Sequence, residues 1–433
     1  MLDVDPILDD PDTRIVVCCG SGGVGKTTTA AALGLRAAER GRKVVVLTID
    51  PARRLAQSMG IDSLDNVPRR VKGIEDASGG ELHAMMLDMK RTFDEIVEGH
   101  ADPERAAAIL SNPFYQSLSA GFAGTQEYMA MEKLGQLRAR EEWDLIVVDT
   151  PPSRSALDFL DAPKRLGSFL DGKLIRVLLA PAKVGGRAGM KFLNVGMSMM
   201  TGALGKVLGG QLLRDVQTFV AAMDSMFGGF RTRADATYKL LQAPGTAFLV
   251  VAAPERDALR EAAYFVERLD AEDMPLAGLV LNRVHGSGAA QLSAERALAA
   301  AENLEDSRIV DQRDGKAGLR NSPDTYGSSD SPDAPSAEAP QPPEDASRTG
   351  ADSSRPAGQD VEQLTAGLLR LHAERMQLLS REQRTRDRFT ALHPEVAVAE
   401  VAALPGDVHD IAGLRNIGDR LATNRPELPS TDA

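Results

Sequence analysis

The sequence has few cysteines, few aromatic residues and no long apolar run. Its two cysteines, Cys18 and Cys19, are adjacent, so one chain can build neither a disulfide framework nor a tetrahedral zinc site from them. A reducing cytoplasm fits this content best. Aromatic residues make up only 4% of the chain, so the core must rest on aliphatic side chains, alanine and methionine. The most apolar uncharged stretch near the middle, residues 192–205, is too short to span a bilayer.

Positive charge is also scarce. The formal net charge of -12 argues against sequence-independent binding to nucleic acid or to an anionic membrane. Residues 1–10 are acidic and lack a basic region followed by an apolar stretch, so we do not expect a signal peptide there. Hydrophobic residues make up 43% of the 433 residues, which is enough to bury a sizeable core. This length predicts one large domain with an accessory part.

Short apolar runs alternate with longer helical patterns along most of the chain. Several runs are continuously apolar, which is typical of strands buried on both faces of a parallel sheet. Helical segments between them indicate βαβ units. We therefore expect an α/β fold with a doubly wound, mostly parallel sheet flanked by helices, and a helical subdomain. The predicted strands are Arg14–Cys19, Val44–Asp50, Leu82–Leu87, Leu145–Asp149, Phe248–Ala252, Ala277–Asn282 and Val396–Ala402.

Two segments interrupt this alternation. Residues 163–241 are rich in methionine and glycine, contain no convincing strand, and are typical of several helices. Residues 321–360 are rich in Pro, Ser and Asp and contain no Leu, Ile, Val, Met, Phe or Trp. Such a segment cannot bury enough apolar surface to offset its ordering entropy, so it is predicted to be a disordered insertion. A helical pattern then resumes over residues 361–389. Its apolar residues on roughly one face are Val361, Leu364, Leu368, Leu371 and Leu378.

These patterns predict a core that is divided by its accessory segments. We expect flexible ends and a core in three parts. The predicted boundaries are 1–12 for an acidic N-terminus, 13–162 for the first part of the core, 163–243 for the helical Met-rich subdomain, 244–320 for the second part of the core, 321–360 for the insertion, 361–424 for the C-terminal helix, strand and loop, and 425–433 for the tail.

The sharpest motif is a glycine-rich loop between the first strand and a helix that begins near Lys26. Its pattern, G-x-x-x-x-G-K-T, is that of the phosphate-binding loop of P-loop NTPases. Glycines let backbone N–H groups surround phosphate oxygens, and the helix N-terminus adds a favourable dipole. Lys26 is expected to bridge the β and γ phosphates of ATP, and Thr27 to bind Mg²⁺ through its hydroxyl. The predicted ATP-binding residues in this region are Gly20, Ser21, Gly22, Gly23, Val24, Gly25, Lys26, Thr27 and Thr28.

Two aspartates end predicted strands. The apolar run at 145–149 ends in Asp149, which is the Walker B pattern, and this carboxylate is expected to hold Mg²⁺ through a water or to sense the γ-phosphate. Asp50 ends another strand at the edge where ligands bind in doubly wound sheets, and is predicted to orient the attacking water. Either aspartate alone is more typical of a turn or a helix cap. Together with the loop, they favour an ATPase site.

With these motifs in place, the chain resembles the ArsA/Get family of P-loop ATPases. That family contains arsenite-efflux ATPases and targeting ATPases for tail-anchored membrane proteins. The resemblance covers nearly the whole chain except 321–360. The matching segments are Gly20–Thr29, Thr48–Arg53, Gln126–Tyr128, Asp149–Pro152, Ala253–Glu255, Leu281–Arg283 and Leu404–Val408.

The resemblance implies roles for further residues. It implies that Asn282 hydrogen-bonds adenine, that Pro405 in an adenine loop lines the base, and that Asp50 is the water-activating carboxylate. It also implies dimers with ATP between the subunits and a helical subdomain that handles hydrophobic clients. The cofactors so implied are ATP and Mg²⁺. The location implied is cytoplasmic, with peripheral membrane contact through a partner as an open alternative.

The chain departs from this family at three points. The family loop usually begins Gly-Lys-Gly-Gly, and the lysine reaches the partner's phosphates, whereas this chain has Ser21 there. A heterodimer with a homologous ATPase subunit is therefore favoured, and a homodimer stays open. The Cys-x-x-Cys that shares zinc in eukaryotic targeting ATPases is absent, so we expect no zinc. Cys18 and Cys19 are neighbours on one strand, which favours packing over a metalloid or redox site and makes arsenite efflux less favoured.

The Met-rich segment leaves two interpretations open. Methionine is flexible and polarizable, so a groove lined by it can accept varied apolar helices. The same spacing is typical of an ordinary helical core or a dimer surface. The residues concerned are Leu193, Met197, Met200, Leu204 and Leu208.

Two functions follow from the sequence. The first is Mg²⁺-dependent ATP hydrolysis that drives a dimeric switch acting on a hydrophobic client or membrane-protein partner. The second is a catalytically weak nucleotide-binding subunit that supports an active paralogue, and Ser21 is the residue that keeps it open. No nucleic-acid partner is expected.

Overall fold

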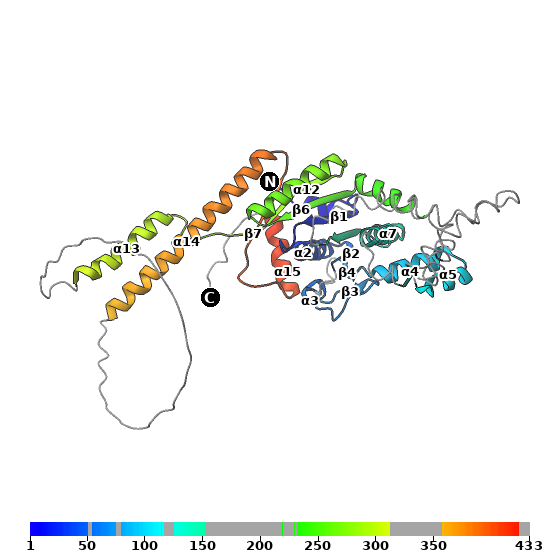
Figure 1. Cartoon of the computed structure of the whole chain (residues 1–433), viewed down its shortest axis with the longest axis horizontal. Helices are drawn as coiled ribbons and strands as arrows, with labels where there is room; N and C mark the ends of the chain where they lie inside the picture. Colours follow the sequence, from blue (N-terminus) through cyan, green and yellow to red (C-terminus); the bar gives the residue numbers. More distant parts are fainter. Residues whose placement is uncertain are drawn as a thin grey trace, which may run out of the picture. The chain divides into compact units, whose positions relative to one another are not determined.

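The computed structural model describes residues 1–50, 54–74, 79–113, 115–116, 125–151, 219, 229, 232–311 and 357–423. The chain divides into two compact units, Met1–Gly286 with Arg381–Ala433, and Ser287–Ser380. The first unit contains an eight-stranded sheet in the order β3-β4-β2-β5-β1-β6-β7-β8 (Figure 1). All neighbouring strands are parallel except β3 and β4. The strands are β1 Ile15–Gly20, β2 Lys43–Thr48, β3 Arg69–Arg70, β4 Glu81–Met86, β5 Leu145–Asp149, β6 Thr246–Ala252, β7 Leu276–Val284 and β8 Val398–Ala402.

The mostly parallel α/β sheet confirms the predicted fold class, and each of the seven predicted strands overlaps an observed one. The prediction missed β3, which pairs antiparallel with β4 at the edge of the sheet through only Arg69 and Arg70. Two exposed arginines carry neither apolar periodicity nor burial, so no sequence pattern indicates this strand.

Two apolar layers cover the two faces of the sheet. Side chains of successive strand residues point to opposite faces, so alternate residues of β1 enter different cores. Ile15, Val17 and Cys19 belong to one core, and Val16 and Cys18 to the other. The first core includes residues of α4 (Met89–His100), α5 (Pro103–Leu110), α7 (Thr125–Ala139) and α12 (Arg256–Ala271), and the second includes residues of α1 (Asp5–Asp9), α2 (Lys26–Glu39), α3 (Arg54–Ser58) and α15 (Ile411–Thr423).

The two cysteines therefore occupy separate cores, as expected for neighbours on one strand. Both are fully buried free thiols. Burial raises the pKa of Cys19 to about 12 and that of Cys18 well above its ordinary value, so both stay protonated at neutral pH. Protonated thiols in apolar surroundings are poor nucleophiles and poor metal ligands, which supports the packing interpretation.

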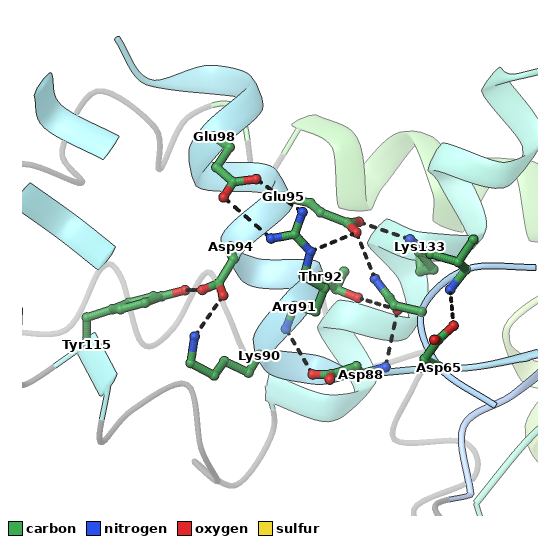
Figure 2. Close-up of polar contacts among 12 residues, drawn as sticks. Asp65, Asp88, Lys90, Arg91, Thr92, Asp94, Glu95, Glu98, Tyr115 and Lys133 are labelled. Carbon is green, nitrogen blue, oxygen red and sulfur yellow. Dashed lines mark hydrogen bonds and ion pairs between the residues drawn. The ribbon is translucent and has the colours of Figure 1, made fainter. Parts of the chain in front are cut away.

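A partly buried polar network joins α4 to α7 and to the loop before β3 (Figure 2). The Lys133 Nζ on α7 donates to Glu95 Oε2 on α4 at 3.0 Å, and Asn66 Nδ2 donates to Glu95 Oε1 at 3.2 Å. Asp88 caps the N-terminus of α4 by accepting from the Arg91 backbone N–H at 2.9 Å. The Lys133 side chain is 4% exposed and that of Glu95 is 25% exposed, so the ammonium end of this ion pair is shielded from solvent.

The second unit contains α13 (Ala294–Asp311) and the first part of α14, which runs from Ala357 to Leu392. Arg370 on α14 pairs with Glu305 on α13 at 2.5 Å, and the His372 ring nitrogen Nε2 lies 2.8 Å from the Leu292 carbonyl oxygen. Small residues on one side of α14, Ala366 and Ala373, are buried.

The opposite side of α14 carries a row of exposed apolar side chains, which we call the α14 stripe. The helix itself confirms the helical pattern predicted for residues 361–389. Helical spacing places the stripe about half a turn from Ala366 and Ala373. Side chains of this size are usually covered in a folded protein, and here each is more than a third exposed. The stripe consists of Val361 (62% exposed), Leu364 (65%), Leu368 (57%), Leu371 (63%) and Leu378 (38%).

Several predicted features lie outside the described residues. These are most of the Met-rich segment, with Met197 and Met200, and residues 321–356 of the predicted insertion. The last residues of the predicted insertion are helical, because α14 begins at Ala357. Among the residues that the structure describes, no helix has the length and apolarity needed to cross a membrane.

Candidate functional site

The glycine-rich loop follows β1, the strand at which the chain order of the sheet reverses. β1 lies between β5 and β6, and ligands bind at the carboxyl ends of parallel strands at such a point. Gly25 has φ 97° and precedes the first residue of α2. A Cβ on Gly25 would lie 2.2 Å from the Asn282 amide nitrogen, so this position requires glycine for space as well as for backbone conformation. The predicted loop-to-helix turn is therefore present.

Lys26 is the first residue of α2 and is buried. Its Nζ donates to the Ser21 carbonyl oxygen, near the other end of the loop, at 2.7 Å. Burial lowers the pKa of Lys26, and the nearby Asp149 carboxylate opposes this shift. A buried ammonium group held by a single carbonyl gains a stronger partner when an anion enters the loop. The Ser21 side chain itself is neutral and Ser21 is 8% exposed.

Thr27, Thr48 and Asp149 form a cluster at the carboxyl edge of the sheet, which we call the Asp149 cluster. The register of the parallel strands aligns Asp149 on β5 with Cys18 on β1 and with Thr48 on β2. Both threonine hydroxyls donate to Asp149 Oδ2 at 2.8 Å. Asp149 Oδ1 is buried and has no hydrogen-bond partner. An unsatisfied carboxylate oxygen in a fully buried residue is costly, and such an oxygen marks a place for a cation or a water.

The electrostatics of Asp149 agree with this geometry. Burial raises the pKa of Asp149 to about 6, although the hydrogen bonds from Thr27 and Thr48 oppose the shift. Hydroxyl and carboxylate oxygens are the ligands that Mg²⁺ prefers in phosphate-binding sites. The donor set and the unpaired oxygen therefore fit the predicted metal, with Thr27 as a direct ligand and Asp149 as a direct or water-mediated one.

Asp50 lies two residues beyond the end of β2, next to the Asp149 cluster in sequence and in space. The Asp50 backbone N–H donates to Thr48 Oγ1 at 3.2 Å, so the same hydroxyl that contacts Asp149 also fixes the Asp50 backbone. Asp50 is half-buried. The structure thus brings Lys26, Thr27, Asp50 and Asp149 to one edge of the sheet.

Asn282 and Pro405 line a second region of the same edge, a cavity of 680 Å³ that also includes Gly25 and Thr28. Asn282 Nδ2 donates to the Val24 carbonyl oxygen at 2.8 Å, and Asn282 Oδ1 accepts from the Arg283 backbone N–H at 2.9 Å. Arg283 has φ 60°, a conformation that costs free energy in a residue other than glycine. The cavity is large enough for a nucleoside, and the structure brings the predicted base-binding residues to it.

Sequence reasoning missed two residues of this cavity, His285 and Glu382. The Glu382 carboxylate accepts from the His285 backbone N–H at 3.2 Å, and the His285 Nδ1 lies 2.5 Å from its other oxygen. Glu382 comes from α14, almost a hundred positions further along the chain. A single glutamate in a charged helix gives no signal of its own, so only the three-dimensional arrangement reveals this pair.

A loop of this shape at the switch point of a parallel sheet defines a P-loop nucleotide-binding protein, and the fold and site assign the chain to that class. Comparison with known proteins narrows the assignment. The family model for anion-transporting ATPases matches residues 13–309. The chain belongs to this family, and it is an ATPase.

Individual relatives agree with the family. ATPase GET3 of Podospora anserina is 27% identical over 300 residues, which cover 67% of this chain and 80% of that protein. ATPase ASNA1 homolog 2 of Paramecium tetraurelia is 25% identical over 282 residues, or 64% of this chain and 78% of that protein. ATPase GET3 of Malassezia globosa is 31% identical over 164 residues, but the match spans only 46% of that relative's length.

Proposed function

We propose that the chain binds and hydrolyses ATP with Mg²⁺ at the carboxyl edge of the sheet and uses this cycle to switch a dimer. The single observation that carries the proposal is the Asp149 cluster, in which two hydroxyls orient a buried carboxylate whose second oxygen has no partner. Thr27 and Asp149 would hold Mg²⁺, and the bound cation would supply positive charge to the phosphates. Ser21, Gly22 and Gly23 would surround the phosphates together with the rest of the loop.

The residues of the site would have separate roles in the reaction. The Lys26 ammonium would leave the Ser21 carbonyl and bind the β and γ phosphates, where it stabilises the charge of the transition state. Asp50 would orient a water in line with the γ-phosphate, because Thr48 fixes the Asp50 backbone beside the Asp149 cluster. Asn282 and Pro405 would hold the base in the cavity that they line.

The test of this proposal removes one hydroxyl. Thr27→Val keeps the shape of the side chain but deletes the metal ligand, so the affinity for ATP in the presence of Mg²⁺ should fall about tenfold, or ~1.4 kcal/mol. Thr246→Val is the matched control, because this buried threonine starts β6 and its hydroxyl bonds to the Leu240 carbonyl oxygen at 2.9 Å. Calorimetry with Mg²⁺ and with a chelator measures both. Equal Mg²⁺ dependence in wild type and Thr27→Val would contradict the site.

The dimer partner is a separate part of the proposal. Ser21 is too short to cross an interface and carries no charge, so this chain can receive a lysine from a partner but cannot supply one. A heterodimer with a homologous ATPase that retains the loop lysine therefore completes the site on this chain. A catalytically weak subunit that supports such a paralogue is the second candidate, and it rests on the same residue.

Turnover distinguishes these arrangements. The purified chain should hydrolyse ATP weakly, an added paralogue should raise the rate, and Ser21→Lys should partly restore turnover in the lone chain if it self-associates. Rapid hydrolysis by the purified chain that no partner changes would remove the case for a heterodimer. A rise on mixing that persists when the site on this chain is inactivated by Lys26→Ala would favour the subunit that supports an active paralogue.

The client and the location complete the proposal. The resemblance to targeting ATPases and the methionine content of residues 163–241 support a hydrophobic or membrane-protein client bound by that segment, and the two free cysteines support a cytoplasmic location. Charged substitutions at Met197 and Met200 should abolish capture of an apolar helical peptide while leaving ATP affinity unchanged. Loss of ATP binding in the same variants would instead make these methionines part of the core.

A further inference from the structure

The α14 stripe has the spacing of a coiled-coil seam. Its residues, Val361 to Leu378, follow one another at intervals of three, four, three and seven, and Arg375 occupies the position that divides the last interval. This is the a/d pattern of a heptad repeat, whose period of 3.5 keeps one face of a helix against a partner helix. An ordinary helix that packs on a globular core shows a broader apolar face of period 3.6.

The described part of the second unit does not cover this seam. Ala366 and Ala373, on the opposite side of α14, are the buried positions, and Arg370 and His372 make the polar contacts to α13 and its preceding loop. Each stripe residue is exposed by 38% to 65%. Residues 321–356 cannot supply an apolar cover, because they contain no Leu, Ile, Val, Met, Phe or Trp. A partner helix with the same a/d pattern would bury this seam.

We propose that the α14 stripe pairs with the α14 stripe of a second copy of this chain as a short antiparallel coiled coil. The charge of Arg375 favours an antiparallel over a parallel arrangement of the two helices. In a parallel, in-register pair the two Arg375 side chains would face each other within the seam, and like charges there are destabilising. In an antiparallel pair centred between Leu368 and Leu371, Val361 faces Leu378 of the other copy and Arg375 faces Leu364, so the two Arg375 residues lie about 16 Å apart along the seam.

This contact is distinct from the nucleotide-dependent dimer of the proposed function. No residue of the stripe belongs to the phosphate loop, the Asp149 cluster or the base cavity. The seam is about 26 Å long at 1.5 Å per residue, which is under three heptads. A seam of this length gives modest affinity, so we expect self-association that depends on protein concentration and needs no nucleotide.

The first experiment is sedimentation velocity of the full chain without nucleotide over about a hundredfold range of micromolar concentrations. Wild type should shift from monomer to dimer, and Leu364→Glu with Leu371→Glu should stay monomeric. The matched control is Gln363→Glu with Gln377→Glu, which adds the same charge at exposed positions off the stripe and should dimerise like wild type. Thermal melting and ATP affinity should be unchanged in both double variants, which shows that the fold is intact.

Each other outcome overturns the proposal. Monomeric wild type at every concentration excludes a second copy, and a lower melting temperature in the Leu364→Glu, Leu371→Glu variant would then show that the stripe is covered within its own chain. Dimerisation of that variant equal to wild type places the self-association elsewhere. Lys26→Ala separates this inference from the proposed function, because it should weaken ATP binding and leave nucleotide-free self-association unchanged.

The second experiment tests whether the two α14 helices are antiparallel. Copies carrying Val361→Cys are mixed with copies carrying Leu378→Cys that bear a different tag, and a mild oxidant is added. The two native cysteines are buried and do not compete. An antiparallel seam yields disulfides between the two kinds of copy. Self-linking of Val361→Cys alone contradicts it, because two copies of residue 361 would be about 25 Å apart in the antiparallel pair.

Discussion

In the Asp149 cluster, polar side chains are buried between apolar strands, whereas along the α14 stripe apolar side chains are exposed on a charged helix. Asp149 is 0% exposed and Leu364 is 65% exposed, which is the reverse of what each residue type usually shows. Both arrangements cost free energy in the isolated chain. We propose that different partners relieve this cost: a cation and a phosphate for the cluster, and an apolar helix for the stripe.

The two regions also differ in how far apart their residues lie in the sequence. The Asp149 cluster takes one side chain each from α2, β2 and β5, and Asp149 lies more than a hundred residues along the chain from both Thr27 and Thr48. The α14 stripe comes from a single helix, so its pattern is local. Substitutions in one region should therefore leave the property of the other unchanged, and the following predictions use that independence.

The largest expected effect is on stability, at Asp149. Because burial raises its pKa to about 6 in the folded chain, the protonated form favours folding. This stabilising contribution is fully present below about pH 4 and is lost as pH rises through about 6, a change of at most about 3 kcal/mol. In the nucleotide-free protein, Asp149→Asn should remove that change. Melting temperatures of both proteins between pH 4 and 8 measure the difference.

A stability difference between the two proteins that does not vary with pH would contradict this account of Asp149. Leu364→Glu provides the comparison from the other region. It introduces a charge at an exposed position, so its melting temperature relative to wild type should not follow the Asp149 profile.

The second effect is on turnover. Asp50→Asn removes the carboxylate that would orient water, and the loss appears mainly in the transition state. In the active assembly, hydrolysis should fall on the order of a hundredfold, about 2.7 kcal/mol, while ATP binding persists. Asp144→Asn is the control, since this carboxylate lies at the opposite edge of the sheet and accepts from the Lys43 backbone N–H at 2.8 Å. Parallel losses of binding and turnover would make Asp50 a structural residue.

The third effect is on affinity. Lys26→Ala removes the cation that would bind the β and γ phosphates, so ATP should bind at least about tenfold more weakly, or ~1.4 kcal/mol. Lys43→Ala removes a partly exposed lysine near the far edge and should bind ATP like wild type. Calorimetry measures both, and sedimentation of the same samples should show unchanged self-association. Unaltered ATP affinity in Lys26→Ala would exclude the phosphate-loop assignment.

The smallest effect is expected from the segment between α13 and α14. Replacing residues 321–356 with a short Gly/Ser linker should leave the melting temperature, ATP affinity and self-association nearly unchanged, because the replaced segment has no Leu, Ile, Val, Met, Phe or Trp to pack. The boundary is residue 356, since α14 begins at Ala357. A marked loss of self-association would mean that this segment takes part in the contact.

Much of the fold could be predicted because its signals are local. A continuously apolar run such as 145–149 predicts a strand, and the glycine-rich loop followed by Lys26 predicts the turn into α2. The order of strands is not local. Only the sheet shows that β5 lies between β1 and β2, which aligns Asp149 with Thr48 and makes that threonine a partner of the carboxylate.

The candidate site was predictable to the extent that its residues belong to motifs. His285 and Glu382 belong to none, and they reach the cavity from β7 and α14 through tertiary packing. The α14 residues were predictable as one face of a helix, but their exposure was not. Periodicity reports which residues share a face and does not report what lies opposite that face.

The hydrogen bonds of Asn282 set a limit on which base the cavity can select. A side-chain amide has two N–H groups and two carbonyl lone pairs, and one of each is already used by Val24 and Arg283. One donor and one acceptor remain. That pair matches the N6 amino group and the N7 of adenine, whereas the O6 and N7 of guanine are both acceptors and would leave the amide oxygen unused. In the proposed function the glycine-rich loop contacts only phosphates, so discrimination against GTP would rest on this one amide.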